Sequence, residues 1–120
     1  MKKILIIDDE EYFCRALKKG LEFKTDFQVW TALTGSDGIH LAKTEKPDVI
    51  LLDIMMPGMD GTEVAETLLE HPATSSIPII FVTAIVSEND IKRNAGVAGG
   101  RTFIAKPVKI DELIEKINAM

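Results

Sequence analysis

The sequence predicts an α/β fold in which a doubly wound, five-stranded parallel sheet carries helices on both faces. Short aliphatic runs such as Val49–Leu52 alternate along the chain with longer segments whose apolar residues recur at helical spacing. The connections between successive runs are long enough for a helix, which makes neighbouring strands parallel and their crossovers right-handed. Several runs also stop abruptly at a polar residue, as Val49–Leu52 does at Asp53.

The first strand and the first helix are predicted at the start of the chain. Residues 4–7 are all aliphatic and end at Asp8 and Asp9, a composition that is typical of a strand buried on both faces. Residues 10–24 are predicted to form an amphipathic helix, with acidic residues at the positive end of its dipole. The apolar residues that recur every four positions in this helix are Phe13, Leu17 and Leu21.

A second strand, a second helix and a third strand follow. Residues 27–32 are rich in aromatic and β-branched side chains, which favours a strand. A short helix is expected from Gly35 and ends before Pro47, because proline disfavours helical backbone at the residue before it. Val49–Leu52 are again fully aliphatic and form the third strand.

The third helix is predicted after a loop. Pro57 and Gly58 prevent the third strand from continuing, and Asp60 offers an N-cap for a helix that begins at Gly61. The helix stops at His71, which precedes a proline.

Two more strands and two more helices complete five βα units. Residues 79–82 form the fourth strand and end at Thr83, and residues 102–105 form the fifth strand and end at Lys106. Between them, Ser87 provides an N-cap for a helix whose end is weakened by a group of glycines. The last helix has its apolar residues at ideal helical spacing, namely Ile110, Leu113, Ile114 and Ile117.

The composition limits the class of protein. The chain has 120 residues, which fits one domain over residues 1–120, and its formal net charge of −5 argues against direct nucleic-acid binding by this segment. Cys14 is the single cysteine, so no intrachain disulfide can form, and its place in a helix indicates a buried thiol. The sequence contains neither a signal peptide nor an apolar stretch of transmembrane length, and the expected location is therefore the cytoplasm, without membrane contact.

Polar residues follow four of the five predicted strands, and a parallel sheet brings them to one edge. They are Asp8, Asp9, Asp53, Thr83 and Lys106. Carboxylates that converge in a partly desolvated place raise one another's pKa, so cations must neutralise them. Lys106 supplies one positive charge, and a hard divalent ion such as Mg²⁺ supplies the rest. Such a site can receive a phosphoryl group, with Asp53 as the nucleophile because it stands alone after its strand.

These motifs make the chain resemble, from end to end, the receiver domain of bacterial two-component response regulators. The resemblance rests on Asp8-Asp9, on Asp53 followed by Met56-Pro57-Gly58-Met59-Asp60-Gly61, on Thr83-Ala84 and on Lys106-Pro107. It implies a flavodoxin-like fold with strand order 2-1-3-4-5. It also implies that Asp53 takes phosphate from a phosphohistidine on a sensor histidine kinase or a histidine phosphotransfer protein.

The resemblance further implies a role for each matching residue. Asp9 would bind Mg²⁺, or alternatively Mn²⁺, directly, while Asp8 acts largely through water and the backbone carbonyl of Met55 completes the protein ligands together with Asp53. Thr83 and Lys106 would hold the phosphoryl oxygens.

Other matching positions concern the response to phosphate and its lifetime. Phe103 occupies the position of the switch aromatic and would turn inward when Thr83 moves toward the phosphate. The face formed by the fourth helix, fifth strand and fifth helix would then change shape and control an output domain or a partner protein. Met55, Ala84 and Ile85 flank the route of the phosphate, and Met55 and Ile85 are expected to shield the acyl phosphate from water because both are apolar.

Alternatives to a signalling switch stay open at this stage. One is a pseudo-receiver, which would have the same fold but act only as a binding surface. Another is a Mg²⁺-dependent phosphohydrolase with an aspartyl nucleophile, although Met55 occupies the place where such an enzyme would need a general acid. As a switch, the chain would catalyse its own phosphorylation and dephosphorylation, and it could form a homodimer through its output face.

Overall fold

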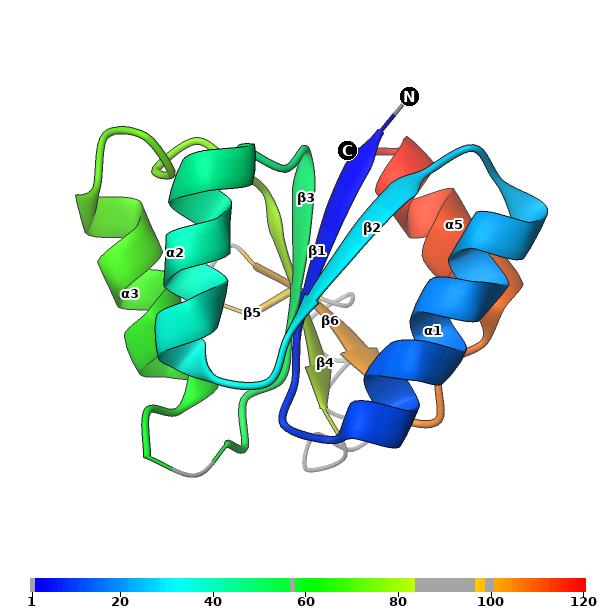
Figure 1. Ribbon diagram of the computed structural model, residues 1–120, viewed down its shortest axis with the longest axis horizontal. Coiled ribbons are helices and arrows are strands. Elements are labelled where there is room, and N and C mark those ends of the chain that lie inside the picture. Colours follow the sequence, from blue (N-terminus) through cyan, green and yellow to red (C-terminus); the bar gives the residue numbers. More distant parts are fainter. Residues whose placement is uncertain (1, 57, 84–96, 99–100) are drawn as a thin grey trace.

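The structure, a computed structural model, describes residues 2–56, 58–83, 97–98 and 101–120. At residues 83, 97, 98 and 101 the description is limited to the backbone. Figure 1 shows a central twisted sheet with helices packed on both of its faces.

The sheet contains five parallel strands in the order β2-β1-β3-β4-β6, and a sixth strand, β5, extends it at the β6 edge. The short strand β5 (Val97–Ala98) runs antiparallel to β6. The parallel strands are β1 (Lys3–Ile7), β2 (Gln28–Ala32), β3 (Val49–Leu52), β4 (Ile79–Thr83) and β6 (Arg101–Ala105). When only the parallel strands are numbered along the chain, so that β6 is the fifth, their order in the sheet is 2-1-3-4-5. This order confirms the predicted doubly wound fold.

Helices cover both faces of this sheet. In Figure 1, α2 (Gly35–Glu45) and α3 (Gly61–Glu70) lie on one side, and α1 (Glu11–Lys24) and α5 (Ile110–Asn118) lie on the other. None of the helices in the described part of the chain has the length and apolarity needed to cross a lipid bilayer.

The core has two halves because alternate residues of each strand point to opposite faces. On β1, Ile4 and Ile6 pack in the cluster on the α1 and α5 side, whereas Leu5 and Ile7 pack in the cluster on the α2 and α3 side. All four side chains are buried, as expected for a strand whose two faces are both covered by helices. This two-sided burial explains why the central strands are continuous aliphatic runs rather than alternating patterns.

Local sequence signals set the ends of the helices. The side chain of Asp60 accepts a hydrogen bond from the Glu63 backbone N–H at 3.0 Å, which confirms it as the N-cap of α3. Thr34 caps α2 in the same way by accepting from the Asp37 N–H. As predicted, α2 ends before Pro47 and α3 ends before His71.

The predictions were incomplete between β4 and β6. The helix expected from Ser87 lies outside the described residues. Strand β5 was not predicted, because its two residues fall among the glycines that were interpreted as the weak end of that helix. A strand of this length has no periodicity that a sequence pattern could reveal.

Candidate functional site

The carboxyl ends of β1 and β3 bring the first two acidic residues together. Ile7 on β1 is in register with Leu52 on β3, so Asp8 and Asp53 leave neighbouring strands at the same level. The sheet pattern continues through both residues, since the Asp8 N–H donates to the Ala32 carbonyl and the Asp53 N–H donates to the Ile7 carbonyl, each at 3.0 Å. These backbone hydrogen bonds therefore fix the Cα positions from which the two carboxylate side chains extend.

Lys106 reaches these carboxylates from the end of β6. Its Nζ atom lies 2.9 Å from Asp8 Oδ2, 2.8 Å from Glu10 Oε1 and 3.7 Å from Asp53 Oδ2. The Lys106 side chain is only 13% exposed, and its ammonium group also lies 4.3 Å from the centre of the Phe13 ring. The lysine is thus held by opposite charges and by an aromatic face at the same time.

The electrostatics of the site follow from this crowding. Burial raises the pKa of Asp8 and of Asp53, and for both groups this effect outweighs the favourable charge of Lys106. The negative charge of Asp8 raises the pKa of Asp53 further. Burial lowers the pKa of Lys106, but its bonds with Glu10 and Asp8 more than compensate, so that its pKa lies above the ordinary value. The site therefore has a surplus of negative charge that a single lysine does not balance.

One oxygen of the site lacks a hydrogen bond. Asp8 is 1% exposed, and its Oδ1 atom accepts a hydrogen bond from the Glu10 backbone N–H at 2.9 Å. Its Oδ2 atom lies at ion-pair distance from Lys106 but accepts no hydrogen bond from any residue that the structure describes. The Lys106 ammonium alone does not offset the cost of burying this carboxylate, since the pKa of Asp8 is still raised, so a second cation would be favourable.

The donor set fits a hard divalent cation. Within the described ranges, carboxylate oxygens of Asp8, Glu10 and Asp53 lie within 4.8 Å of one another. Oxygen donors of this kind suit Mg²⁺, which usually takes one or two carboxylates and keeps several water molecules. The buried Asp8 carboxylate and the surplus negative charge both point to the same ion.

The other two residues expected to bind metal, Asp9 and Met55, are not members of this carboxylate group. Asp9 is exposed. The Met55 backbone N–H donates to Asp53 Oδ1 at 3.3 Å, which orients the Asp53 carboxylate, while the Met55 side chain is exposed.

The residues expected to respond to phosphate are only partly described. The backbone of Thr83 ends β4 and pairs with Ala105, whereas the Thr83 side chain, Ala84 and Ile85 lie outside the described residues. Phe103 is half-buried on β6, and its ring stacks on Phe81 with the centroids 5.1 Å apart.

Sequence reasoning missed two residues of the site. Glu10 was interpreted as an acid at the start of a helix, and Phe13 as a residue of that helix's apolar face. Both belong to the beginning of α1, yet both contact Lys106, which is far away in the sequence. The run of four consecutive acids from Asp8 to Glu11 is the sequence signal that could have drawn attention to Glu10.

The loop after β3 is packed tightly against the start of α3. The Gly61 N–H donates to the Ile54 carbonyl at 2.8 Å, and a Cβ atom at position 61 would collide with the Asp53 carbonyl oxygen and with Ile54 Cα. Only glycine allows α3 to begin this close to the backbone of Asp53.

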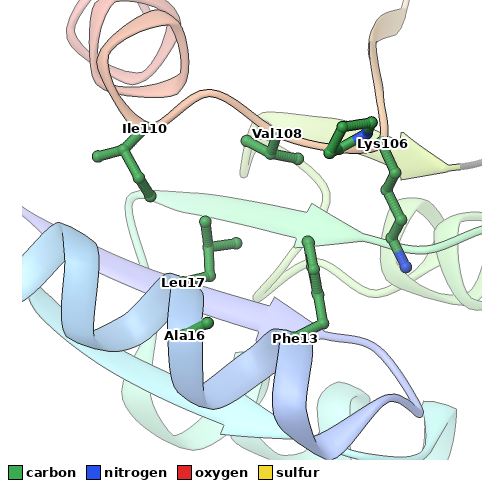
Figure 2. A pocket seen from close by; sticks show the side chains of 7 residues that line it. Phe13, Ala16, Leu17, Lys106, Val108 and Ile110 are labelled. Atoms are coloured by element: carbon green, nitrogen blue, oxygen red, sulfur yellow. The ribbon is translucent and has the colours of Figure 1, made fainter.

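An apolar cavity of about 490 Å³ opens beside the acidic site. Figure 2 shows it between α1 and the segment that leads from β6 into α5, with Phe13 and Lys106 at one end and Ile110 at the other. Its lining residues are Phe13, Ala16, Leu17, Lys106, Pro107, Val108 and Ile110. The cavity thus connects an apolar surface to the lysine of the acidic site.

Comparison with known proteins identifies relatives over the whole chain. Residues 4–118 match the family model described as the response regulator receiver domain. Protein PilH of Pseudomonas aeruginosa is 42% identical over 120 residues, an alignment that covers 100% of this chain and 98% of PilH. Response regulator PleD of Caulobacter vibrioides is 35% identical over 119 residues, which are 98% of this chain but only 26% of PleD.

One solved structure is similar to this chain in both fold and sequence. A response regulator receiver domain protein (CheY-like) from Methanospirillum hungatei superimposes with a TM-score of 0.82 at 32% identity, covering 99% of this chain and 92% of that chain. The similarity therefore includes every strand whose end contributes to the acidic site.

Proposed function

Because the chain belongs to the response regulator receiver domain family, which serves phosphorylation-based signalling in two-component systems, we propose that Asp53 is its phosphoacceptor. The single observation that supports this most strongly is the grouping of Asp53, Asp8 and Lys106 at the carboxyl edge of the sheet. Ligand sites of open α/β sheets lie at this edge.

The reaction is a transfer between two covalent carriers. An Asp53 carboxylate oxygen attacks the phosphorus atom of a phosphohistidine, the P–O bond forms, and the P–N bond breaks as the imidazole nitrogen leaves with its electron pair. Lys106 lies 3.7 Å from Asp53 Oδ2 and is placed to hold a phosphoryl oxygen. The Met55 N–H keeps the attacking carboxylate in its orientation.

Receiver domains bind Mg²⁺ at an acidic pocket. We assign the ion to Asp9, Asp53 and the backbone carbonyl of Met55 as direct ligands, with Asp8 acting largely through water, and Mn²⁺ as the alternative ion because it prefers the same oxygen donors. When bound, the ion screens the negative charge of the phosphoryl group from the carboxylates.

The phosphoryl donor is a sensor histidine kinase or a histidine phosphotransfer protein. The apolar cavity between α1 and the segment that leads into α5 ends at Lys106 and is our candidate for the place where an apolar side chain of this donor docks. Receiver domains act on output domains or partner proteins, and the surface around β6 and α5 is our candidate for that contact.

The switch depends on how phosphate changes the balance between two conformations. Phosphate on Asp53 can shift this balance only through contacts that differ between the two states. We assign the differential contacts to Thr83 and Lys106, with Phe103 turning inward from its stack on Phe81.

The lifetime of the signal depends on access of water to the aspartyl phosphate. Met55 and Ile85 are apolar, and we propose that they, together with Ala84, flank the route of the phosphate to Asp53. We expect the two apolar side chains to slow attack by water on the phosphorus atom. Rapid phosphate loss that is not accelerated by polar substitutions at both positions would contradict this.

Intact mass after incubation with acetyl phosphate and Mg²⁺ tests the function. The wild-type chain should gain one phosphoryl group, and the gain should disappear in Asp53→Asn and in the presence of EDTA. Absence of any gain in the wild type would leave a binding surface without phosphorylation as the function. Release of free phosphate with sustained turnover would instead indicate a phosphohydrolase.

A further inference from the structure

Glu10 is the residue of the acidic site to which the proposed function gives no role. Its Oε1 atom lies 2.8 Å from Lys106 Nζ, which is shorter than the 3.7 Å between Lys106 and the phosphoacceptor Asp53. Lys106 therefore binds Glu10 more closely than it binds Asp53.

The position of Glu10 is not explained by helix capping. Glu10 is the N-cap residue of α1, but its side chain makes no capping hydrogen bond. Glutamate is also not among the residues that cap helices well, in contrast to Asp60 at α3. Its carboxylate instead crosses to a lysine that lies 96 residues further along the chain.

The Glu10 carboxylate lies next to the carboxylate that would carry the phosphoryl group. Oxygens of Glu10, Asp8 and Asp53 are all within 4.8 Å of one another, so a phosphoryl group on Asp53 brings its terminal oxygens into the space between them. The buried Asp8 Oδ2 atom lies 2.9 Å from the Lys106 ammonium group. The Glu10 side chain is 62% exposed and can leave for solvent, whereas Asp8 is enclosed and cannot.

We propose that Glu10 is a positioning residue that occupies the phosphoryl-binding place on Lys106, and that phosphorylation of Asp53 exchanges the Glu10 carboxylate for a phosphoryl oxygen. This inference rests on the proposed function and adds a step to it. Before phosphorylation, the Glu10 carboxylate accepts a hydrogen bond from the Lys106 ammonium group and holds that group at the site. The phosphoryl group then has to displace an internal anion, which opposes phosphorylation.

Removal of the Glu10 charge should therefore favour phosphorylation. An ion pair with one exposed partner is weak, so Glu10→Gln should increase the rate of phosphorylation by acetyl phosphate by roughly two- to fivefold. The difference from wild type should shrink at high salt, because salt screens the exposed carboxylate. Beryllium trifluoride, a non-covalent phosphoryl mimic, should bind the Mg²⁺-loaded Glu10→Gln variant more tightly by a similar factor.

Two further variants make the test specific. Glu11→Gln removes the same charge from the next residue. The Glu11 side chain is 61% exposed and pairs with Arg15 at 3.4 Å rather than with Lys106, so this variant should be phosphorylated at the wild-type rate. Glu10→Asp keeps the charge but shortens the side chain, so it should lose the contact with Lys106 and resemble Glu10→Gln. Rates from intact mass and beryllium trifluoride affinities from ¹⁹F NMR are measured for all four proteins.

The outcomes separate this inference from the proposed function. If the wild type takes up no phosphate, the proposed function fails. If the wild type is phosphorylated on Asp53 but Glu10→Gln is equally fast or slower, the exchange is wrong and Glu10 is structural or assists directly. If Glu10→Asp is phosphorylated at the wild-type rate and Glu11→Gln at the rate of Glu10→Gln, the rate follows net charge rather than the contact with Lys106. Long-range repulsion, and not the exchange, then explains the effect.

Discussion

The ammonium group of Lys106 lies among three carboxylates, those of Glu10, Asp8 and Asp53, at distances of 2.8, 2.9 and 3.7 Å. Two of these acids are buried and have raised pKa values because burial penalises their charged forms. At neutral pH each of these two carboxylates therefore opposes folding, whereas Lys106, whose pKa is raised by its bonds to Glu10 and Asp8, favours it.

Asp53→Asn should stabilise the protein in the absence of divalent ions. The variant keeps the shape of the side chain but removes one of the crowded charges, so the melting temperature at pH 7 in EDTA should rise by roughly 3–5 °C, corresponding to about 1 kcal/mol. Asp26→Asn removes an exposed charge and serves as the control with little expected change. A lower melting temperature for Asp53→Asn would contradict the surplus of negative charge at the site.

The same pair of proteins gives a pH dependence with a defined sign. The folded-state pKa of Asp53 is raised above the ordinary value of 3.8, so the folded state binds the proton more tightly than the unfolded state. The contribution of Asp53 to stability is therefore present below pH 3.8 and is lost as the pH rises through the raised pKa. The advantage of Asp53→Asn over wild type should accordingly be largest at neutral pH and shrink on acidification, as followed by thermal melts in EDTA.

Cys14 should be inert in the folded protein. Its thiol is buried under the site and donates to the Asp8 carbonyl at 3.4 Å, and burial raises its pKa to about 12. The thiolate fraction near neutral pH is then about 1,000-fold below that of an ordinary cysteine, so alkylation by iodoacetamide should be slower by at least about 100-fold than in urea. Equal rates of mass gain in both conditions would contradict this burial.

Single residues also show which parts of the site a sequence can predict. Asp8, Asp53 and Lys106 were predictable because each directly follows a strand, and parallel strands deliver such residues to one edge. Glu10 and Phe13 were not, because their contact with Lys106 depends on how the first turn of α1 sits over the end of β6. No local periodicity encodes that placement.

At the scale of elements, the start of α3 fixes the loop that carries Asp53. Gly61→Ala should be strongly destabilising, by about 2–3 kcal/mol, since the new Cβ would meet backbone atoms of Asp53 and Ile54 that cannot move aside easily. The displaced loop should also slow phosphorylation of Asp53. Urea unfolding and intact mass measure the two effects.

Gly58 supplies the matched control in the same loop. It has φ of +84°, but a Cβ atom there would meet nothing within 4 Å. Gly58→Asn should cost less than Gly61→Ala, since asparagine tolerates the left-handed conformation. Equal losses at both positions would indicate that backbone conformation, rather than the close approach of α3, sets the geometry of the loop.

The elements themselves follow the sequence closely where hydrophobic patterns are long. Helix α5 and strands β1 and β3 lie where periodicity and aliphatic runs place them. Strand β5 escaped prediction because two residues pair with β6 through backbone bonds that any sequence can make.

At the scale of the whole molecule, the sheet is held by two cores, one on each face. The acidic site lies at the edge of the sheet between them and consists of residues from the ends of β1, β3 and β6 together with the first residue before α1. A cation that binds there stabilises an arrangement that only the folded chain possesses.

Mg²⁺ should therefore raise the melting temperature of the wild-type protein. At a free Mg²⁺ concentration of ten times its dissociation constant, the free energy of unfolding increases by about 1.4 kcal/mol. This increase corresponds to a rise in melting temperature of roughly 4–6 °C for a domain of this size. The shift should be reversed by EDTA and be much smaller in Asp8→Asn, which removes the buried charge of Asp8. A full shift in Asp8→Asn would place the ion elsewhere.

The ion pair between Lys106 and Asp8 also has a consequence for biosynthesis. A ribosome releases the two strands that carry the aspartates before it releases β6, so the nascent chain holds its acids without their internal counter-ion until Lys106 has left the ribosome. The acidic pocket can close only when the final strand docks. Chains that stop before residue 106 should consequently lack a competent signalling site, however well their earlier strands have formed.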